Sequence, residues 1–349
     1  MTNDLPAPAT AASHSPIASG DTSPVASGKA TPVVGRFAPS PSGRMHLGNA
    51  VAALLAWLGA RSAGGRMVLR IEDIDPRSRH RDHALTLMDD LRWLGIDWDE
   101  GPYWQTERTH HYQEALDLLG QAGLTYPCFC TRAQIHAASA PHESDGTYVY
   151  QGACRNLTPQ QVAEKSRLRH PATRLVVPDA QSADGTVRFD DLVFGPHEER
   201  LARDCGDFVV SRSDGIAAYQ LAVVVDDGLM GVTQVVRGRD LLGSTARQIY
   251  LMGLLGFEVP QYAHVPLVVA PDGRRLSKRD RDLDLGALRA AGTPPQRVAG
   301  WIAHATGLTD DFCETDASDL VDAFSWERLR THHEDIVVDE AALSLLRYT

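Results

Sequence analysis

Residues 36–49 read RFAPSPSGRMHLGN, and this stretch decides the fold. A Val-Val pair before it predicts a short buried strand, and residues 50–63, rich in Ala and Leu, predict a helix after it. A tight loop between a strand and a helix suits an anionic ligand, because free N–H groups and the helix dipole favour phosphate. Gly43 and Gly48 allow close backbone approach, and His46 adds a hydrogen-bond donor. The stretch therefore indicates a phosphate site, and the alternative is a plain turn between two core elements.

The same stretch resembles the first signature of class I aminoacyl-tRNA synthetases, in the form found in the glutamate and glutamine enzymes. The four residues 46–49 read HLGN, where the name-giving HIGH motif ends in a second histidine. The resemblance implies an α/β fold with a Rossmann-like parallel sheet. It implies that His46 is catalytic and binds ATP together with Gly48 and Asn49. It also implies that glutamate is bound by the residues before the signature: Arg36, Phe37, Ala38, Pro39 and Ser40.

Length and composition limit the class of protein. The chain has 349 residues, 43% of them apolar, which is enough for more than one domain and a sizeable core. A net charge of −11 argues against extended nucleic-acid binding and leaves room for a local basic contact. Five cysteines, an odd number, indicate a reducing compartment. No apolar run approaches the length of a membrane span, and residues 1–30 lack a signal-peptide core, so we expect a cytoplasmic protein without membrane contact.

A second polar cluster follows the next predicted strand. Residues 67–71, MVLRI, lead into residues 72–79, EDIDPRSR, and charged groups just past a strand's end lie where open α/β sheets bind ligands. The Asp-Pro pair could equally start a helix, which leaves a capped, solvated loop as the alternative. The cluster resembles the RIEDTD segment of glutamyl- and glutaminyl-tRNA synthetases, with Ile74 at the Thr position. That resemblance implies that Glu72 holds the amino group of the bound amino acid.

Three cysteines have a spacing that could bind a metal. Cys128 and Cys130 form a Cys-x-Cys pair and Cys154 follows later, which leaves a tetrahedral zinc one ligand short. By ligand chemistry alone a histidine is the favoured fourth ligand, and three buried, inert thiols are the alternative to any metal site. The candidates near in sequence are His136, His142, Tyr148 and Tyr150.

Family resemblance changes the ranking of these ligands. Cys-x-Cys followed by Tyr-x-x-x-Cys resembles the zinc site of the glutamyl-Q tRNA(Asp) synthetases, short relatives of the glutamyl enzymes. One structural zinc per chain is then expected in an insertion of low regularity, residues 128–200. Its implied ligands are Cys128, Cys130, Tyr150 and Cys154.

The second half of the chain supplies two further candidates. Residues 208–227 predict two strands around a Ser-Asp-Gly turn, the second apolar nearly throughout, as in a strand buried on both faces. Residues 232–236 predict another strand that ends in Arg237. Tyr219 alone would be a core aromatic, but an Arg beside Gly at a strand end suits a carboxylate fork. The stretch resembles the second half of the glutamyl-type catalytic domain, which implies that Tyr219 and Arg237 contact glutamate.

A basic loop completes the motifs. Residues 274–279 read RRLSKR after a predicted turn, and such a loop suits polyphosphate, although a solvated basic loop is the alternative. It resembles the second class I signature, KMSKS, in its KLSK form. The resemblance implies that Lys278 contacts ATP and takes part in catalysis, and that Mg²⁺ accompanies the phosphates.

We expect five parts along the chain: a disordered tail (1–30), the first half of the catalytic domain (31–127), the zinc-bearing insertion (128–200), the second half with the KMSKS-like loop (201–285) and a short helical tail (286–349). Further helices are predicted at 82–94, 108–122, 244–255, 287–291, 295–306 and 339–346, and a strand at 263–269. Residues 93–102 are interpreted as helix ends and a turn.

The resemblance covers residues 33–285 and implies a two-step reaction. The carboxylate of L-glutamate attacks the α-phosphate of ATP, and the glutamyl group of the adenylate then passes to an acceptor. The short tail lacks the helical anticodon-binding domain of a full glutamyl-tRNA synthetase, which favours queuosine in the anticodon of tRNA(Asp) as acceptor. We expect a monomer. Two alternatives stay open: a truncated glutamyl-tRNA synthetase that charges a tRNA 3′ end, and an inactive paralogue that only binds.

Overall fold

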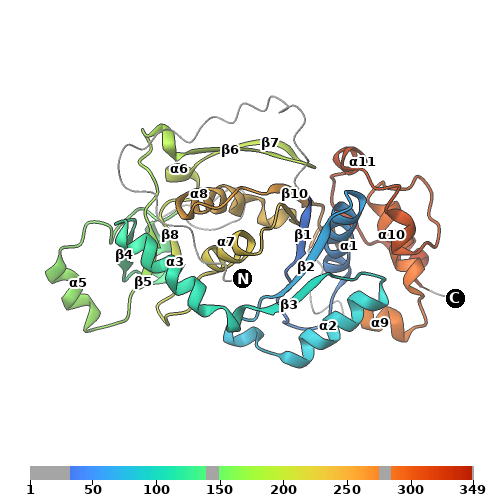
Figure 1. The fold of residues 1–349 in the computed structure, drawn as a ribbon, viewed down its shortest axis with the longest axis horizontal. Coiled ribbons are helices and arrows are strands. Elements are labelled where there is room, and N and C mark those ends of the chain that lie inside the picture. The colour runs from blue at the N-terminus through green and yellow to red at the C-terminus, as the bar shows by residue number, and fades with distance from the viewer. Residues whose placement is uncertain (1–31, 139–148, 275–283, 348–349) are drawn as a thin grey trace.

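The computed structural model describes residues 32–138, 149–274 and 284–347, and its centre is a seven-stranded sheet. The strand order is β3-β2-β1-β9-β10-β6-β7, and among these strands only β7 runs antiparallel to its neighbour (Figure 1). The predicted Rossmann-like parallel sheet is confirmed. Its strands are β1 (Val34–Phe37), β2 (Arg66–Ile71), β3 (Glu100–Trp104), β6 (Thr186–Asp191), β7 (Gly195–Arg200), β9 (Gln234–Gly238) and β10 (Gln261–Val265).

Two hydrophobic cores pack on this sheet. In the first, α1 (Leu47–Ser62) contacts β1, β2 and β9, and the tail helix α10 (Pro295–Ala305) packs into the same core. Because it is covered from both sides, α1 is apolar nearly all round and not only along one stripe. The second core joins α3 (Thr109–Gln121), α7 (Tyr219–Leu229) and α8 (Thr245–Leu255). None of the helices in the described ranges has the length and apolar composition needed to cross a bilayer.

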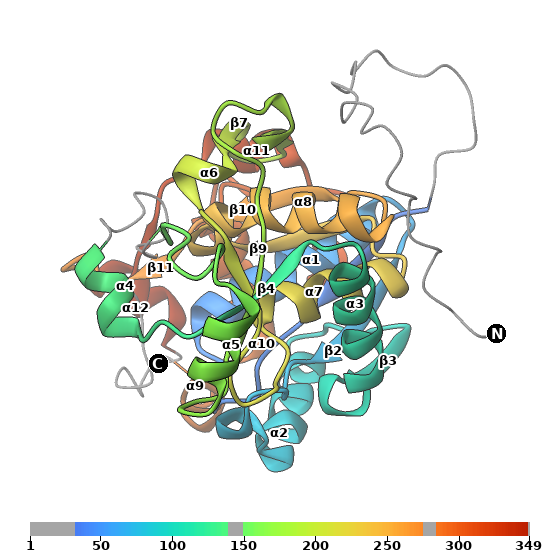
Figure 2. The same ribbon diagram turned by 90° about the vertical axis from the view of Figure 1, so that its left-hand side faces the viewer.

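A smaller antiparallel sheet lies beside the main one, in the order β4-β5-β8. Its strands are β4 (Thr125–Cys128), β5 (Ala172–Leu175) and β8 (Phe208–Ser211), with α4 (Arg132–Ala138), α5 (Pro159–Ser166) and α6 (Leu201–Asp204) nearby in sequence. The expectation of low regularity for residues 128–200 is wrong. Strand β6 lies in this range, pairs with β10 and extends the main sheet. Figures 1 and 2 show the β6–β7 hairpin and α2 (Arg81–Trp93) at opposite edges of the molecule.

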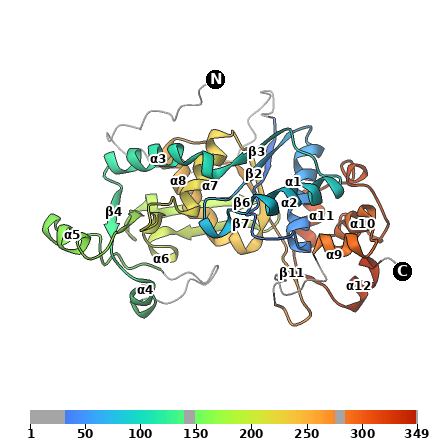
Figure 3. The same cartoon turned by 90° about the horizontal axis from the view of Figure 1, so that it is seen from below.

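The tail is helical, as predicted, and packs into the first hydrophobic core. It contains α9 (Leu285–Ala290), α10, α11 (Trp326–Thr331) and α12 (Glu340–Leu346). A two-stranded sheet, β11 (Val268–Val269) with β12 (Ile336–Val337), joins the tail to the segment after β10. Figure 3 shows α5 and the tail helices at opposite ends of the long axis. The expected boundaries between the five parts stay predictions, and residues 1–31 lie outside the described ranges.

Two predicted elements are wrong. The apolar run from Tyr219, expected to be a strand, is the start of helix α7. A short run that is buried on all sides has no periodicity to separate a strand from a helix, and α7 is enclosed by α3, α8 and β8. Residues 93–102, interpreted as helix ends and a turn, also contain the start of β3, which pairs with β2.

A buried network of ion pairs ties the two halves of the chain together. Asp226 on α7 accepts hydrogen bonds from Nε of Arg108 at 2.6 Å and from the hydroxyl of Tyr112 at 2.8 Å. Its neighbour Asp227 accepts one from Nη1 of Arg70 on β2, at 2.7 Å. Burial alone would lower the pKa of Arg70, but the surrounding carboxylates raise it above its ordinary value. The chain segments joined here are far apart in sequence, so the network fixes how the halves meet.

We predict that Asp226→Ala destabilises the fold by about 3 kcal/mol, because it leaves buried positive charge with one carboxylate fewer. Urea unfolding measures this loss. The matched control is Asp310→Ala, which breaks the surface ion pair with Arg328 and is expected to cost less than about 1 kcal/mol. Equal losses in the two variants would contradict the assigned importance of the network.

Candidate active site

A cavity of about 620 Å³ opens where β1, β2 and β9 end. Groups that follow the carboxyl ends of neighbouring parallel strands meet at one edge of the sheet. The cavity is lined by every predicted glutamate- or ATP-binding residue within the described ranges: Arg36, Phe37, Ala38, Pro39, Ser40, His46, Gly48, Asn49, Glu72, Tyr219 and Arg237. Lys278, the other predicted ATP contact, lies outside the described residues.

The N-terminus of α1 forms one wall of the cavity. His46 is its N-cap residue, and the His46 carbonyl oxygen accepts the N–H groups of Asn49 at 2.9 Å and Ala50 at 3.1 Å. A Cβ atom at Gly48 would lie 3.1 Å from Cε1 of the His46 ring, so glycine leaves the room that this ring occupies. Gly43 has φ 151°, a conformation that favours glycine. This wall suits phosphate because first-turn N–H groups and the helix dipole both attract anions.

A group of buried charges lies at the cavity, with Arg36 and Glu72 in its wall and Arg70 and Asp227 behind them. Arg36 donates from Nη1 to the carbonyl of Val236 at 3.1 Å, and its Nε lies 3.5 Å from Asp227. Nη2 of Arg70 lies 3.3 Å from Oε1 of Glu72. Burial raises the pKa of Glu72, although Arg70 and Arg36 oppose the rise. A cationic ligand group next to Glu72 would favour the ionised carboxylate, and the carboxylate would in turn stabilise that group.

Arg237 is held differently from Arg36 and Arg70. Its guanidinium donates four hydrogen bonds to neutral acceptors: Nε2 of His264 (3.0 Å), Oε1 of Gln248 (2.7 Å), Oγ1 of Thr245 (2.9 Å) and the Leu241 carbonyl (3.3 Å). Among the described residues, no carboxylate forms an ion pair with it, whereas Asp227 pairs with both other arginines. Tyr219, at the start of α7, lines the same cavity. The positive charge of Arg237 is thus available to an anionic ligand.

Sequence reasoning missed several residues that line the cavity, among them Arg44, Asp240 and Leu267. Arg44 lies inside the signature stretch, and its charge could have marked it. Its Nη1 lies 3.9 Å from Oδ1 of Asp90 on α2. Asp90 is buried, and burial raises its pKa to about 6. No sequence pattern pairs these two residues, because they come from separate elements.

A second cluster gathers the predicted metal ligands. The sulfur atoms of Cys128, Cys130 and Cys154 lie within 4.8 Å of one another and could hold a metal ion. The hydroxyl oxygen of Tyr150 lies 3.5 Å from the sulfur of Cys128 and 3.6 Å from that of Cys130. Three thiols and a phenol that converge this closely fit a tetrahedral site. Of the other candidates, His136 lies on α4, and His142 and Tyr148 lie outside the described residues.

Arg174 on β5 supports this cluster. Its Nε donates to the sulfur of Cys128 at 3.3 Å, and its guanidinium carbon lies 3.8 Å from the centre of the Tyr150 ring. Burial would raise the pKa of the Cys128 thiol, but hydrogen bonds with Tyr150 and Arg174 bring it below its usual value. A thiol that ionises more easily is a better metal ligand, because the thiolate is the form that binds.

Comparison with known proteins identifies the family. Residues 32–334 match the family described as tRNA synthetases class I (E and Q), catalytic domain. The chain belongs to this family. It is 48% identical over 307 residues to the Glutamyl-Q tRNA(Asp) synthetase of Nitratidesulfovibrio vulgaris, covering 85% of this chain and 93% of that protein. It is 50% identical over 309 residues to the protein of the same name from Symbiobacterium thermophilum, covering 84% and 93%. The predicted resemblance to the glutamyl-Q tRNA(Asp) synthetases is confirmed.

Solved structures agree on the fold of this class I synthetase. A glutamate tRNA ligase from Elizabethkingia meningosepticum, in complex with its amino acid, superposes with a TM-score of 0.75 at 24% identity. The match covers 90% of this chain and 69% of that one. A glutamate-tRNA synthetase from Elizabethkingia anophelis gives a TM-score of 0.76. Class I synthetases use ATP, and this family implies glutamate, ATP and a tRNA as partners.

We predict that Asp90→Asn stabilises the protein near neutral pH. Since the pKa of Asp90 is raised to about 6, the folded state keeps a proton that the unfolded state releases, and stability is lost as the pH rises above about 4. The variant should gain about 1 to 2 kcal/mol at about pH 7.5 and nothing at about pH 4 in urea unfolding. The exposed Asp322→Asn is the control. A gain of the same size at both pH values would contradict the prediction.

Proposed function

We propose that this class I synthetase activates L-glutamate with ATP and transfers the glutamyl group to queuosine in tRNA(Asp). The observation that carries the proposal is the identity of 48% and 50% to two proteins of that named activity, each over 93% of its length. The cavity supports it, because a charge-bearing Arg237 and a buried Glu72 suit the two ends of an acidic amino acid.

The proposed glutamate site uses opposite charges. Arg237 and Arg36 attract the side-chain carboxylate, Tyr219 contacts the same substrate, and Glu72 pairs with the ammonium group. Residues 37–40 follow β1 along the cavity wall and complete this site. Ammonium binding would stabilise the ionised form of Glu72, whose pKa burial raises.

ATP would occupy the wall formed by the N-terminus of α1. His46, Gly48 and Asn49 contact its phosphates there, Lys278 adds charge from the KLSK segment, and Mg²⁺ accompanies the phosphates. In the first step, a carboxylate oxygen of glutamate bonds to the α-phosphorus and pyrophosphate leaves. In the second, a hydroxyl of queuosine attacks the activated carbonyl carbon and AMP leaves. The chain contributes positioning and charge stabilisation, and no covalent enzyme intermediate is needed.

The cysteine cluster is proposed to bind one structural zinc through Cys128, Cys130, Tyr150 and Cys154. Such a closed site would fasten the end of β4 to the segment that carries Tyr150 and Cys154. We further propose a monomer that works in the cytoplasm. None of the five cysteines, all of which lie in the described ranges, forms a disulfide, which supports a reducing compartment.

The acceptor is tested with labelled glutamate, ATP and tRNA(Asp) purified from cells that can and cannot make queuosine. We expect label only on the queuosine-containing tRNA(Asp), because the second step needs that base as nucleophile. tRNA(Glu) serves as the comparison substrate. Label on tRNA(Glu) irrespective of queuosine would replace the proposal with a truncated glutamyl-tRNA synthetase. No label and no glutamate-dependent pyrophosphate exchange would indicate an inactive paralogue.

The metal is tested by elemental analysis of gently purified protein. About one zinc per chain is expected in the wild type, since three thiolates and one phenolate complete a tetrahedral shell. Cys130→Ser should lose most of it, because that variant removes one sulfur of the cluster. Cys313→Ser is the matched control, since Cys313 is exposed and outside the cluster. A wild type without zinc, or equal zinc in both variants, would contradict the site.

A further inference from the structure

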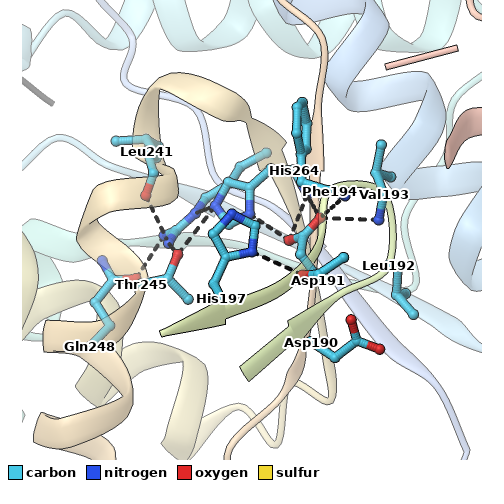
Figure 4. Close-up of polar contacts among 12 residues, drawn as sticks. Asp190, Asp191, Leu192, Val193, Phe194, His197, Leu241, Thr245, Gln248 and His264 are labelled. Carbon is cyan, nitrogen blue, oxygen red and sulfur yellow. Dashed lines mark hydrogen bonds and ion pairs between the residues drawn. The ribbon is translucent and has the colours of Figure 1, made fainter. Parts of the chain in front are cut away.

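Two buried residues that do not line the cavity form a chain of contacts behind Arg237, in which His264 contacts Arg237 and Asp191 contacts His264. His264 on β10 and Asp191 at the end of β6 are both fully buried. Nδ1 of His264 lies 2.6 Å from Oδ2 of Asp191, and Nε of Arg237 donates to Nε2 of His264 at 3.0 Å. Figure 4 shows His264 between Asp191 on one side and Leu241, Thr245 and Gln248 on the other. The last three are the other hydrogen-bond partners of Arg237.

The hydrogen-bond chemistry allows only one arrangement of protons in this chain of contacts. Nε of a guanidinium always carries a hydrogen, so Nε2 of His264 must be the acceptor. The single ring proton of neutral His264 then lies on Nδ1 and is donated to Asp191. A protonated ring would point a second N–H at Arg237, and burial opposes it by lowering the pKa of His264 to about 4.

Asp191 is itself fixed by the backbone. Its Oδ1 accepts the N–H groups of Val193 and Phe194, both at 3.0 Å, and the N–H of His264 at 3.1 Å. Its Oδ2 is the atom that faces the His264 ring. The orientation of the carboxylate is therefore fixed without a ligand. The carboxylate orients the His264 ring, and the ring orients Arg237.

We propose that Asp191 and His264 are positioning residues that hold Arg237 ready for the carboxylate of the substrate. Asp191 selects the tautomer of His264, and the neutral ring orients Arg237 without neutralising its charge. This inference rests on the proposed function in one respect, namely that Arg237 binds glutamate. It adds that specificity for an acidic amino acid depends on the β6–β7 hairpin, which lies outside the cavity.

A purely structural role is the competing explanation, and substitutions at His264 distinguish the two. Glutamine can place an acceptor oxygen near the position of Nε2 and so keep the contact with Arg237. Asparagine can reach only the position of Nδ1, so it keeps a donor for Asp191 and loses the contact with Arg237. Both variants introduce a buried amide into the same space.

Asp191→Asn reverses the proton arrangement with almost no change in shape. The amide can keep its oxygen on Val193 and Phe194, while its NH₂ group donates to Nδ1 of His264. The ring proton must then move to Nε2, where it opposes the N–H of Arg237. Asp190→Asn is the matched control, because the Asp190 side chain is exposed and lies 3.9 Å from Arg330. Figure 4 shows it pointing away from the His264 ring.

The measurement is glutamate-dependent ATP–pyrophosphate exchange, with KM determined separately for glutamate and ATP. Loss of a charge-assisted contact predicts that KM for glutamate rises about tenfold or more in His264→Asn and Asp191→Asn. KM for ATP should stay within about twofold in both, and His264→Gln and Asp190→Asn should resemble the wild type. Thermal unfolding of each variant is recorded in parallel.

Unchanged KM for glutamate in His264→Asn, or an equal rise in His264→Gln, would overturn the inference. A parallel rise of both KM values would also overturn it and indicate a structural role. If Asp191→Asn does not fold, the two His264 variants decide the question. Absence of glutamate-dependent exchange in the wild type is a separate result, since it would overturn the proposed function itself.

Discussion

The ion pair between Arg70 and Asp227 is the contact on which the site depends. Arg70 is fully buried on β2, and Asp227 lies on α7, in the second half of the catalytic fold. A buried charge without its partner is strongly destabilising, so the two halves must meet in this register. The same carboxylate lies 3.5 Å from Arg36, which orients a residue of the cavity. The carboxylate that holds the two halves together therefore also positions Arg36 in the cavity.

The three buried arginines at the site differ in the groups that they contact. Arg36 and Arg70 are paired with carboxylates, whereas Arg237 is surrounded by an imidazole, an amide, a hydroxyl and a carbonyl. Neutral acceptors orient a guanidinium but leave its charge uncompensated, and a buried uncompensated charge attracts an anion. The cavity thus combines a fixed positive group with a carboxylate, Glu72, and under the proposed function the two groups bind opposite ends of the glutamate.

Much of this arrangement could be predicted from the sequence, because it follows chain-local patterns. The strand–loop–helix at residues 34–62 and the strand that carries Arg237 are both signalled by apolar runs followed by polar residues. The helical state of α7 could not be predicted, since a run buried on every side has no amphipathic period. The support of Arg237 by Asp191 and His264 also escaped prediction. It depends on β6 joining the main sheet beside β10, a pairing that no local pattern encodes.

The most direct test of the account is a crystal structure with a non-hydrolysable glutamyl-adenylate analogue. We expect the side-chain carboxylate of the analogue within hydrogen-bonding distance of Arg237 and its ammonium group at Glu72. We also expect the adenylate phosphate at the N-terminus of α1. An analogue bound elsewhere, or bound here with its carboxylate facing away from Arg237, would contradict the account.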